Sequence, residues 1–167
     1  GTKHFALSFY SDFGDSTSEV IKTIILSPQK VIGVVLQPSR ITYLKQLFMP
    51  VGFLSLFSPF YLIFAVPELM INILSNNSQF YQIYYQYTAA ITPFIFISAI
   101  YGIKKIKKTL PKIPNLLFIL YIAFFSLWSS YWFGPLPGAK EANLDMFIRP
   151  VNDREFVDYY LSIIPKR

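Results

Sequence analysis

Two long stretches that are almost free of charge constrain most strongly how this chain can fold. From Gln46 to Ile103 the one charged side chain is Glu68, and from Ile113 to Ala139 there is none. A hydrocarbon core about 30 Å thick takes roughly 20 helical residues to cross, so each stretch is long enough. Over the whole chain 14% of the residues are charged, against about 25% in an ordinary soluble domain. The sequence therefore predicts an all-α, polytopic helical membrane protein.

The positive charge is concentrated between the two stretches. The net charge is +6, and five of the fifteen Lys and Arg residues lie in residues 104–112. Cytoplasmic loops of membrane proteins carry such an excess. Nucleic acid and anionic lipid also attract basic proteins, but topology explains these lysines best, and we expect no nucleic-acid partner. We therefore place residues 104–112 in the cytoplasm and both the tyrosine-rich segment 75–87 and the C-terminal tail outside.

We expect the transmembrane region to cover residues 48–133. Two crossings are predicted, over residues 88–103 and 115–132, each rich in apolar side chains. The second ends in an aromatic belt of the kind found at membrane interfaces. Glycines and prolines at positions 134–138 then end the helix.

The preceding stretch, residues 48–74, is apolar but contains three prolines, each of which kinks or ends a helix. Two arrangements are compatible with it. In the first, residues 48–66 cross once, and Pro67 opens a short interfacial helix from Glu68 to Leu74. In the second Pro59 bends it into a re-entrant hairpin, which would have to be covered by protein because irregular backbone does not face lipid.

Residues 1–47 are predicted to form interfacial amphipathic helices and loops. Ser16 and Glu19 have the spacing of a capping box, so a helix should begin after the polar turn at residues 11–15. Pro28 and Pro38 divide the rest of this region into pieces too short to span a membrane. Such helices suit the membrane surface, with basic side chains reaching water; packing inside the same protein is the alternative. The basic side chains concerned are Lys22, Lys30, Arg40 and Lys45.

Residues 134–167 form an aqueous, extracytoplasmic tail in this prediction. From residue 139 onward five basic and five acidic side chains fall in 29 positions. Apolar residues at helical spacing predict an amphipathic helix over residues 153–164. Because this helix has no partner at the chain end, we interpret it as the start of a truncated soluble portion, and we expect the rest of a larger polypeptide or complex as a partner.

The residues that chemistry could use are few. The chain has no cysteine and one histidine, His4, and we assign it no catalytic residue, no metal site and no cofactor. Glu68 is a functional candidate because an ionisable group among apolar residues is costly; alternatively it is an anion at a helix start, where the macrodipole favours it. The residues that we predict to bind substrate, as polar groups near the outer interface, are Glu68, Asn72, Gln86 and Tyr87.

Several segments in a fixed order resemble the C-terminal half of a known membrane family. They read GDSTSEVI, SPQKVIGVV, YLKQLFMPVGFLSLFSPFYLIFAVPELMINILSNN and YQYTAAITPFIFISAIYGI, followed by REFVDYYLSIIP in the tail. The succession resembles domain-of-unknown-function family 2079, a family of predicted polytopic membrane proteins. One departure is that members often have His-Tyr where this chain has Gln86-Tyr87, so a role that needs imidazole chemistry there is in doubt.

That family is similar to the C-type glycosyltransferases, multi-span enzymes that take a sugar from a polyprenyl-phosphate carrier on the outer face. The resemblance implies a catalytic acid upstream of this chain. It also implies that residues 1–45 lie in an external loop near the lipid carrier, which favours the hairpin or an even number of crossings for residues 48–74. It also implies a location in a prokaryotic plasma membrane and a polyprenyl-phosphate carrier as a partner, in addition to the lipid bilayer that the composition predicts. Fold does not fix function, so a non-catalytic scaffold subunit and a transporter fragment remain alternatives.

Overall fold

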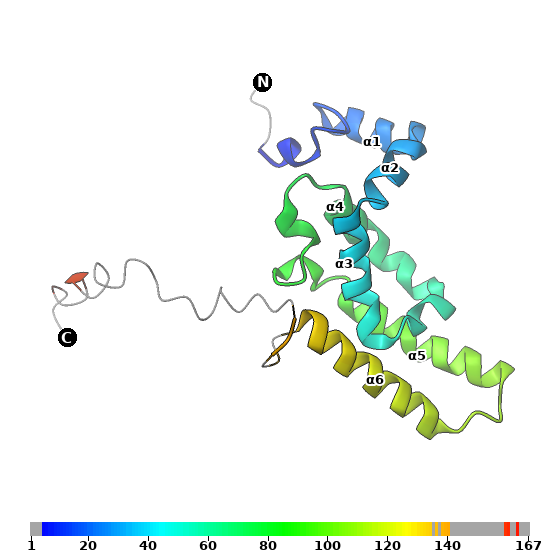
Figure 1. The fold of residues 1–167 in the computed structure, drawn as a ribbon. Helices are drawn as coiled ribbons and strands as arrows, with labels where there is room; N and C mark the ends of the chain where they lie inside the picture. Colours follow the sequence, from blue (N-terminus) through cyan, green and yellow to red (C-terminus); the bar gives the residue numbers. More distant parts are fainter. Residues whose placement is uncertain (1–4, 135, 137, 141–158, 161–162, 164–167) are drawn as a thin grey trace.

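The computed structural model describes residues 5–134, 136, 138–140, 159, 160 and 163. The elements in these residues are all helical, which confirms the all-α prediction. Figure 1 shows α1 and α2 at one end of the molecule and the loop between α5 and α6 at the other. The α-helices are α1 (Thr17–Leu26), α2 (Pro28–Val35), α3 (Pro38–Phe48), α4 (Val66–Leu74), α5 (Thr92–Thr109) and α6 (Asn115–Phe133). The 3₁₀ helices are η1 (Phe5–Tyr10), η2 (Met49–Val51), η3 (Leu54–Phe57), η4 (Pro59–Ala65), η5 (Ser78–Tyr81) and η6 (Gln86–Thr88).

Local signals set the first three helices. The hydroxyl of Ser16 accepts a hydrogen bond from the amide of Glu19 at 3.3 Å, which confirms the predicted cap. The carboxylate of Glu19 reaches back one residue further than expected and accepts from the amide of Asp15 at 2.8 Å. Pro28 and Pro38 each occupy the first turn of a helix, where a missing N–H costs nothing. The three helices therefore stay short, as predicted.

The predicted water-facing position of Arg40 is wrong. Helices α1 and α2 have no buried residue, but α3 buries Arg40 together with Tyr43, Leu47 and Phe48. Tyr43, Leu47 and Phe48 join the hydrophobic core, which also draws on η2, η3, α4 and α5. The alternative of packing inside the protein therefore applies to α3.

The segment between α3 and α4 is a run of 3₁₀ helices. Gly52 adopts φ +59°, its amide donates to the carbonyl of Met49, and the amide of Phe53 donates to the carbonyl of Phe48. This pair of bonds is the Schellman arrangement that ends a helix. Phe53 is also left-handed, with φ +57°. Residues 49–65 are therefore not a continuous α-helix, whereas α4 covers the short helix predicted after Pro67.

Helix α5 covers the 3₁₀ run on one side. The hydroxyl of Ser98 lies against two of its carbonyls, that of Ser55 at 3.1 Å and that of Ser58. One turn further along, a Cβ on Gly102 would overlap the carbonyl oxygen of Leu54. Glycine at this position lets the helix backbone approach the irregular segment closely.

Helix α6 covers the same run from another side. The hydroxyl of Tyr121 donates to the carbonyl of Gly52, and that of Ser126 to the carbonyl of Pro50, each at 2.9 Å. Irregular backbone is tolerated at membrane depth where protein satisfies its polar groups in this way. Side-chain hydroxyls on α5 and α6 thus supply hydrogen-bond donors to backbone carbonyls that a continuous α-helix would have satisfied itself.

Among the described residues α6 is the one helix that is long and apolar enough to cross a membrane. It begins at Asn115, where the second crossing was predicted to start. Only 6% of its most apolar 18-residue stretch is buried inside the protein. Helix α5 differs from the predicted crossing over residues 88–103, because it begins at Thr92 and continues through four lysines to Thr109. The predicted tail helix over residues 153–164 lies outside the described residues except at three positions.

Candidate functional site

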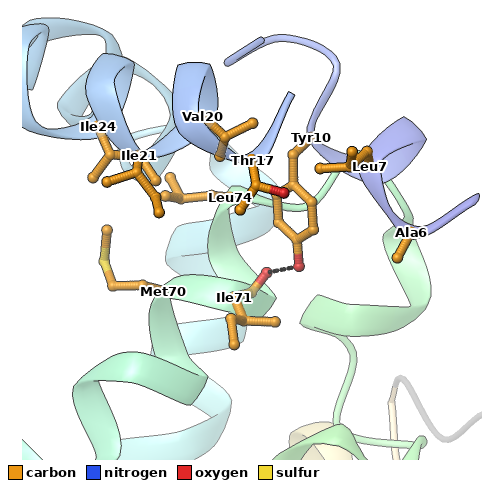
Figure 2. A pocket seen from close by; sticks show the side chains of 10 residues that line it. All are labelled: Ala6, Leu7, Tyr10, Thr17, Val20, Ile21, Ile24, Met70, Ile71 and Leu74. Carbon is orange, nitrogen blue, oxygen red and sulfur yellow. Dashed lines mark hydrogen bonds between the residues drawn. The ribbon is translucent and has the colours of Figure 1, made fainter. Parts of the chain in front are cut away.

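An apolar groove lies between η1, α1 and α4 and has a volume of about 500 Å³. Figure 2 shows its side chains pointing toward one another from these three elements. Its size falls in the range of roughly 300–1,000 Å³ typical of small-molecule sites, which are mostly apolar with a few placed polar groups. The lining residues are Ala6, Leu7, Tyr10, Thr17, Val20, Ile21, Ile24, Met70, Ile71 and Leu74.

Tyr10 connects two of the elements that line this groove, η1 and α4. Its hydroxyl donates a hydrogen bond of 3.1 Å to the carbonyl of Ile71, drawn as a dashed line in Figure 2. Burial raises the pKa of the Tyr10 hydroxyl, and the negative charge of Glu68 raises it further. Glu68 therefore acts electrostatically on a residue that lines the groove. Tyr10 was not among the residues predicted to bind substrate.

Asn72 lies inside the protein on α4 and is 0% exposed. Its side-chain amide donates two hydrogen bonds, at 3.0 Å to the hydroxyl of Tyr43 and at 2.9 Å to the carbonyl of Tyr87. The Oδ1 atom of Asn72 is buried without a hydrogen-bond partner among the described residues, and an unsatisfied buried acceptor is costly. The amide therefore joins α3, α4 and the segment before α5.

The structure brings Tyr87 to Asn72 but leaves Gln86 on the surface. The ring of Tyr87 stacks on Phe80 with centroids 4.2 Å apart and planes 10° apart. Gln86 begins η6 and is exposed. Tyr87 is thus held by Asn72 through its carbonyl and by Phe80 through its ring. Gln86, in the same 3₁₀ turn, is exposed to solvent.

Glu68 is half-buried in the first turn of α4, four residues before Asn72. Residues four apart are neighbours on one helical face, so the two predicted polar groups share a face of α4. Burial raises the pKa of the Tyr43 hydroxyl and the charge of Glu68 adds to this, while the hydrogen bond from Asn72 lowers it. Glu68 also lies in the first turn of α4, where the helix macrodipole favours a negative charge, as the alternative interpretation of this residue expects.

Arg40 is a buried arginine that holds the end of α4 in place. Its guanidinium donates to the carbonyls of Ile73 at 3.3 Å and Ser75 at 2.9 Å, at the end of α4. It also lies 3.7 Å from the centroid of the Tyr81 ring. These partners are neutral and distant in the chain, so no local pattern marks this arginine as buried.

No curated protein and no solved structure matches this chain. A family model described as "Predicted membrane protein (DUF2079)" matches residues 1–151. This match covers most of the chain, including the groove, Glu68 and Asn72 on α4, and helices α5 and α6. The chain therefore belongs to the DUF2079 family of predicted membrane proteins.

Proposed function

We propose that this chain is the C-terminal membrane portion of a multi-pass, C-type glycosyltransferase-like protein of a prokaryotic plasma membrane. In this proposal the catalytic acid lies outside the chain, and the groove between α1 and α4 holds the hydrocarbon part of a polyprenyl-phosphate sugar donor. The observation that carries the proposal is an apolar groove of about 500 Å³ lined by η1, α1 and α4.

Polar groups next to the groove support the assignment. Tyr10 lines it, and Glu68 acts on Tyr10 through its charge. A lipid-linked sugar needs such a combination, because its chain requires an apolar lining and its polar end requires hydrogen-bonding groups. We assign Glu68, Gln86 and Tyr87 to the polar end, and Asn72 to positioning Tyr87 through the carbonyl that it binds.

Two substitutions on α1 test the role of the groove in the full-length protein. Ile21 lines the groove and is 54% exposed, whereas Ile25 is 69% exposed and does not line it. Ile21→Trp should fill the groove and raise KM for a polyprenyl-linked sugar about tenfold, equivalent to about 1.4 kcal/mol. Ile25→Trp adds the same bulk on the same helix and should leave KM unchanged. Equal effects of the two variants would contradict the assignment.

Glu68→Gln and Tyr87→Phe test the polar end in the same transfer assay. Undiminished transfer in both variants would overturn the assignment of these residues. A wild-type protein that folds but neither binds the donor nor supports transfer would instead favour the non-catalytic membrane scaffold.

A further inference from the structure

Two adjoining apolar grooves lie where α5 leads into α6. Figure 1 shows this connection at the end of the molecule opposite α1 and α2. The α5 groove has a volume of about 650 Å³ and lies between η3, the start of η4 and the end of α5. The α6 groove has a volume of about 220 Å³ and is lined by the start of α6 together with η3 and α5. Phe57 and Ile106 line both grooves and so separate them.

The end of α5, which lines both grooves, carries four lysines. Two of them already have partners within the described residues. The ammonium of Lys107 donates to the side-chain oxygen of Asn115, which joins α5 to α6. The ammonium of Lys104 lies 4.8 Å from the centroid of the Tyr101 ring. These two lysines therefore have roles within the fold.

Lys105 and Lys108 are exposed on α5 and lie three residues apart, which places them on one face of the helix. Lys105 also lines the α5 groove. The sequence from residue 69 to residue 140 contains no Asp or Glu, so this part of the chain offers the lysines no carboxylate. An anionic group from outside the chain would complement them.

We propose that this end of the protein binds one anionic diacyl phospholipid. The two grooves take its two acyl chains on either side of Phe57 and Ile106, and Lys105 and Lys108 bind its phosphate. The apolar lining favours a lipid over a soluble phosphate, because a free anion gains nothing from the grooves. Basic pockets beside membrane helices recognise anionic lipid head groups in this way. This inference concerns a different end of the molecule from the α1–α4 groove and does not rest on the proposed function.

Native mass spectrometry of the protein in mild detergent tests the proposal with phosphatidylglycerol and phosphatidylcholine of matched acyl chains. We expect one phosphatidylglycerol to be retained in preference to phosphatidylcholine. One lysine near an anionic lipid contributes roughly a fivefold change in the binding constant, so Lys105→Gln should weaken phosphatidylglycerol binding about fivefold. The control Lys104→Gln removes the same charge from the neighbouring position and should weaken binding less than about twofold.

A second pair of variants tests the acyl-chain site separately from charge. Leu56 lines the α5 groove, and Phe60 is exposed on η4 without lining it. Leu56→Trp should reduce retention of phosphatidylglycerol, and Phe60→Trp should not. Equal retention of the two lipids by the wild type, equal losses in Lys104→Gln and Lys105→Gln, or an unchanged Leu56→Trp would each overturn the proposal.

Discussion

The hydroxyl of Tyr121 on α6 donates a hydrogen bond of 2.9 Å to the carbonyl of Gly52, which is 69 positions earlier in the chain. Gly52 is the C-cap of η2, the 3₁₀ turn that directly follows α3. The bond satisfies a carbonyl that the interrupted helix leaves free, in a segment too apolar to rely on water. It therefore joins the membrane-type helix to the proline-broken segment.

Tyr121→Phe should destabilise the protein by about 1–3 kcal/mol, because the carbonyl of Gly52 loses its donor. Tyr131→Phe is the control, since Tyr131 is an exposed tyrosine on the same helix. Thermal unfolding in detergent, followed by circular dichroism, compares the two. Equal transition temperatures would show that the bond contributes nothing to stability.

Two glycine-to-alanine variants should have opposite effects. In Gly102→Ala the new methyl group would overlap the carbonyl of Leu54, and overpacking of this kind costs about 1–3 kcal/mol. In Gly33→Ala the methyl group on α2 meets nothing within 4 Å, so it should stabilise the helix by roughly 0.5–1 kcal/mol. Chemical denaturation measures both free energies of unfolding. Destabilisation by both variants alike would contradict the close contact at Gly102.

Arg40→Met should destabilise the protein by about 1–3 kcal/mol, because the carbonyls of Ile73 and Ser75 lose their donor. Arg40→Lys should recover at most part of the lost stability. An ammonium lacks the planar guanidinium group, which bonds two carbonyls and at the same time stacks on the Tyr81 ring. Lys45→Met, at an exposed position of the same helix, controls for the loss of a charge. A stable Arg40→Met would show that the buried arginine does not hold α4.

Stability at high pH should depend on Tyr43 and Glu68. Burial raises the pKa of the Tyr43 hydroxyl above its ordinary value of 10.0, and the charge of Glu68 adds to this. The folded state therefore holds the Tyr43 proton more tightly than the unfolded state. The contribution of this protonated hydroxyl to the free energy of unfolding is fully present below the unfolded pKa and is lost as the pH rises through the folded pKa. Tyr43→Phe and Glu68→Gln should each reduce the fall in unfolding free energy above pH 10. Identical pH profiles for the three proteins would contradict the coupling.

Local sequence signals predicted the features that local chemistry determines. The cap by Ser16, the division of the N-terminal region at Pro28 and Pro38, and the extent of α6 each depend on a few neighbouring residues, and the structure confirms them. The predicted end of the first crossing at Ile103 did not anticipate that α5 continues through the lysines. Lysine is a good helix former, so charge ended the predicted crossing without ending the helix.

Long-range contacts determine the features that the sequence did not reveal. The buried position of Arg40 depends on carbonyls at the end of α4 and on an aromatic ring beyond it. The groove requires η1 and α1 to meet α4, which lies much later in the chain. Asn72 and Tyr87 were predicted as site residues separately, and their hydrogen bond appears only in the folded protein.

Photolabelling with a diazirine-bearing polyprenyl phosphate tests most directly whether the α1–α4 groove holds a lipid carrier. The folded full-length protein is irradiated with the probe, and the labelled peptides are identified by mass spectrometry. We predict labelling concentrated in residues 17–26 and 66–74, competed by unlabelled polyprenyl phosphate, reduced by Ile21→Trp and unaffected by Ile25→Trp. Labelling confined to the exposed face of α6, with no difference between the two variants, would contradict the account.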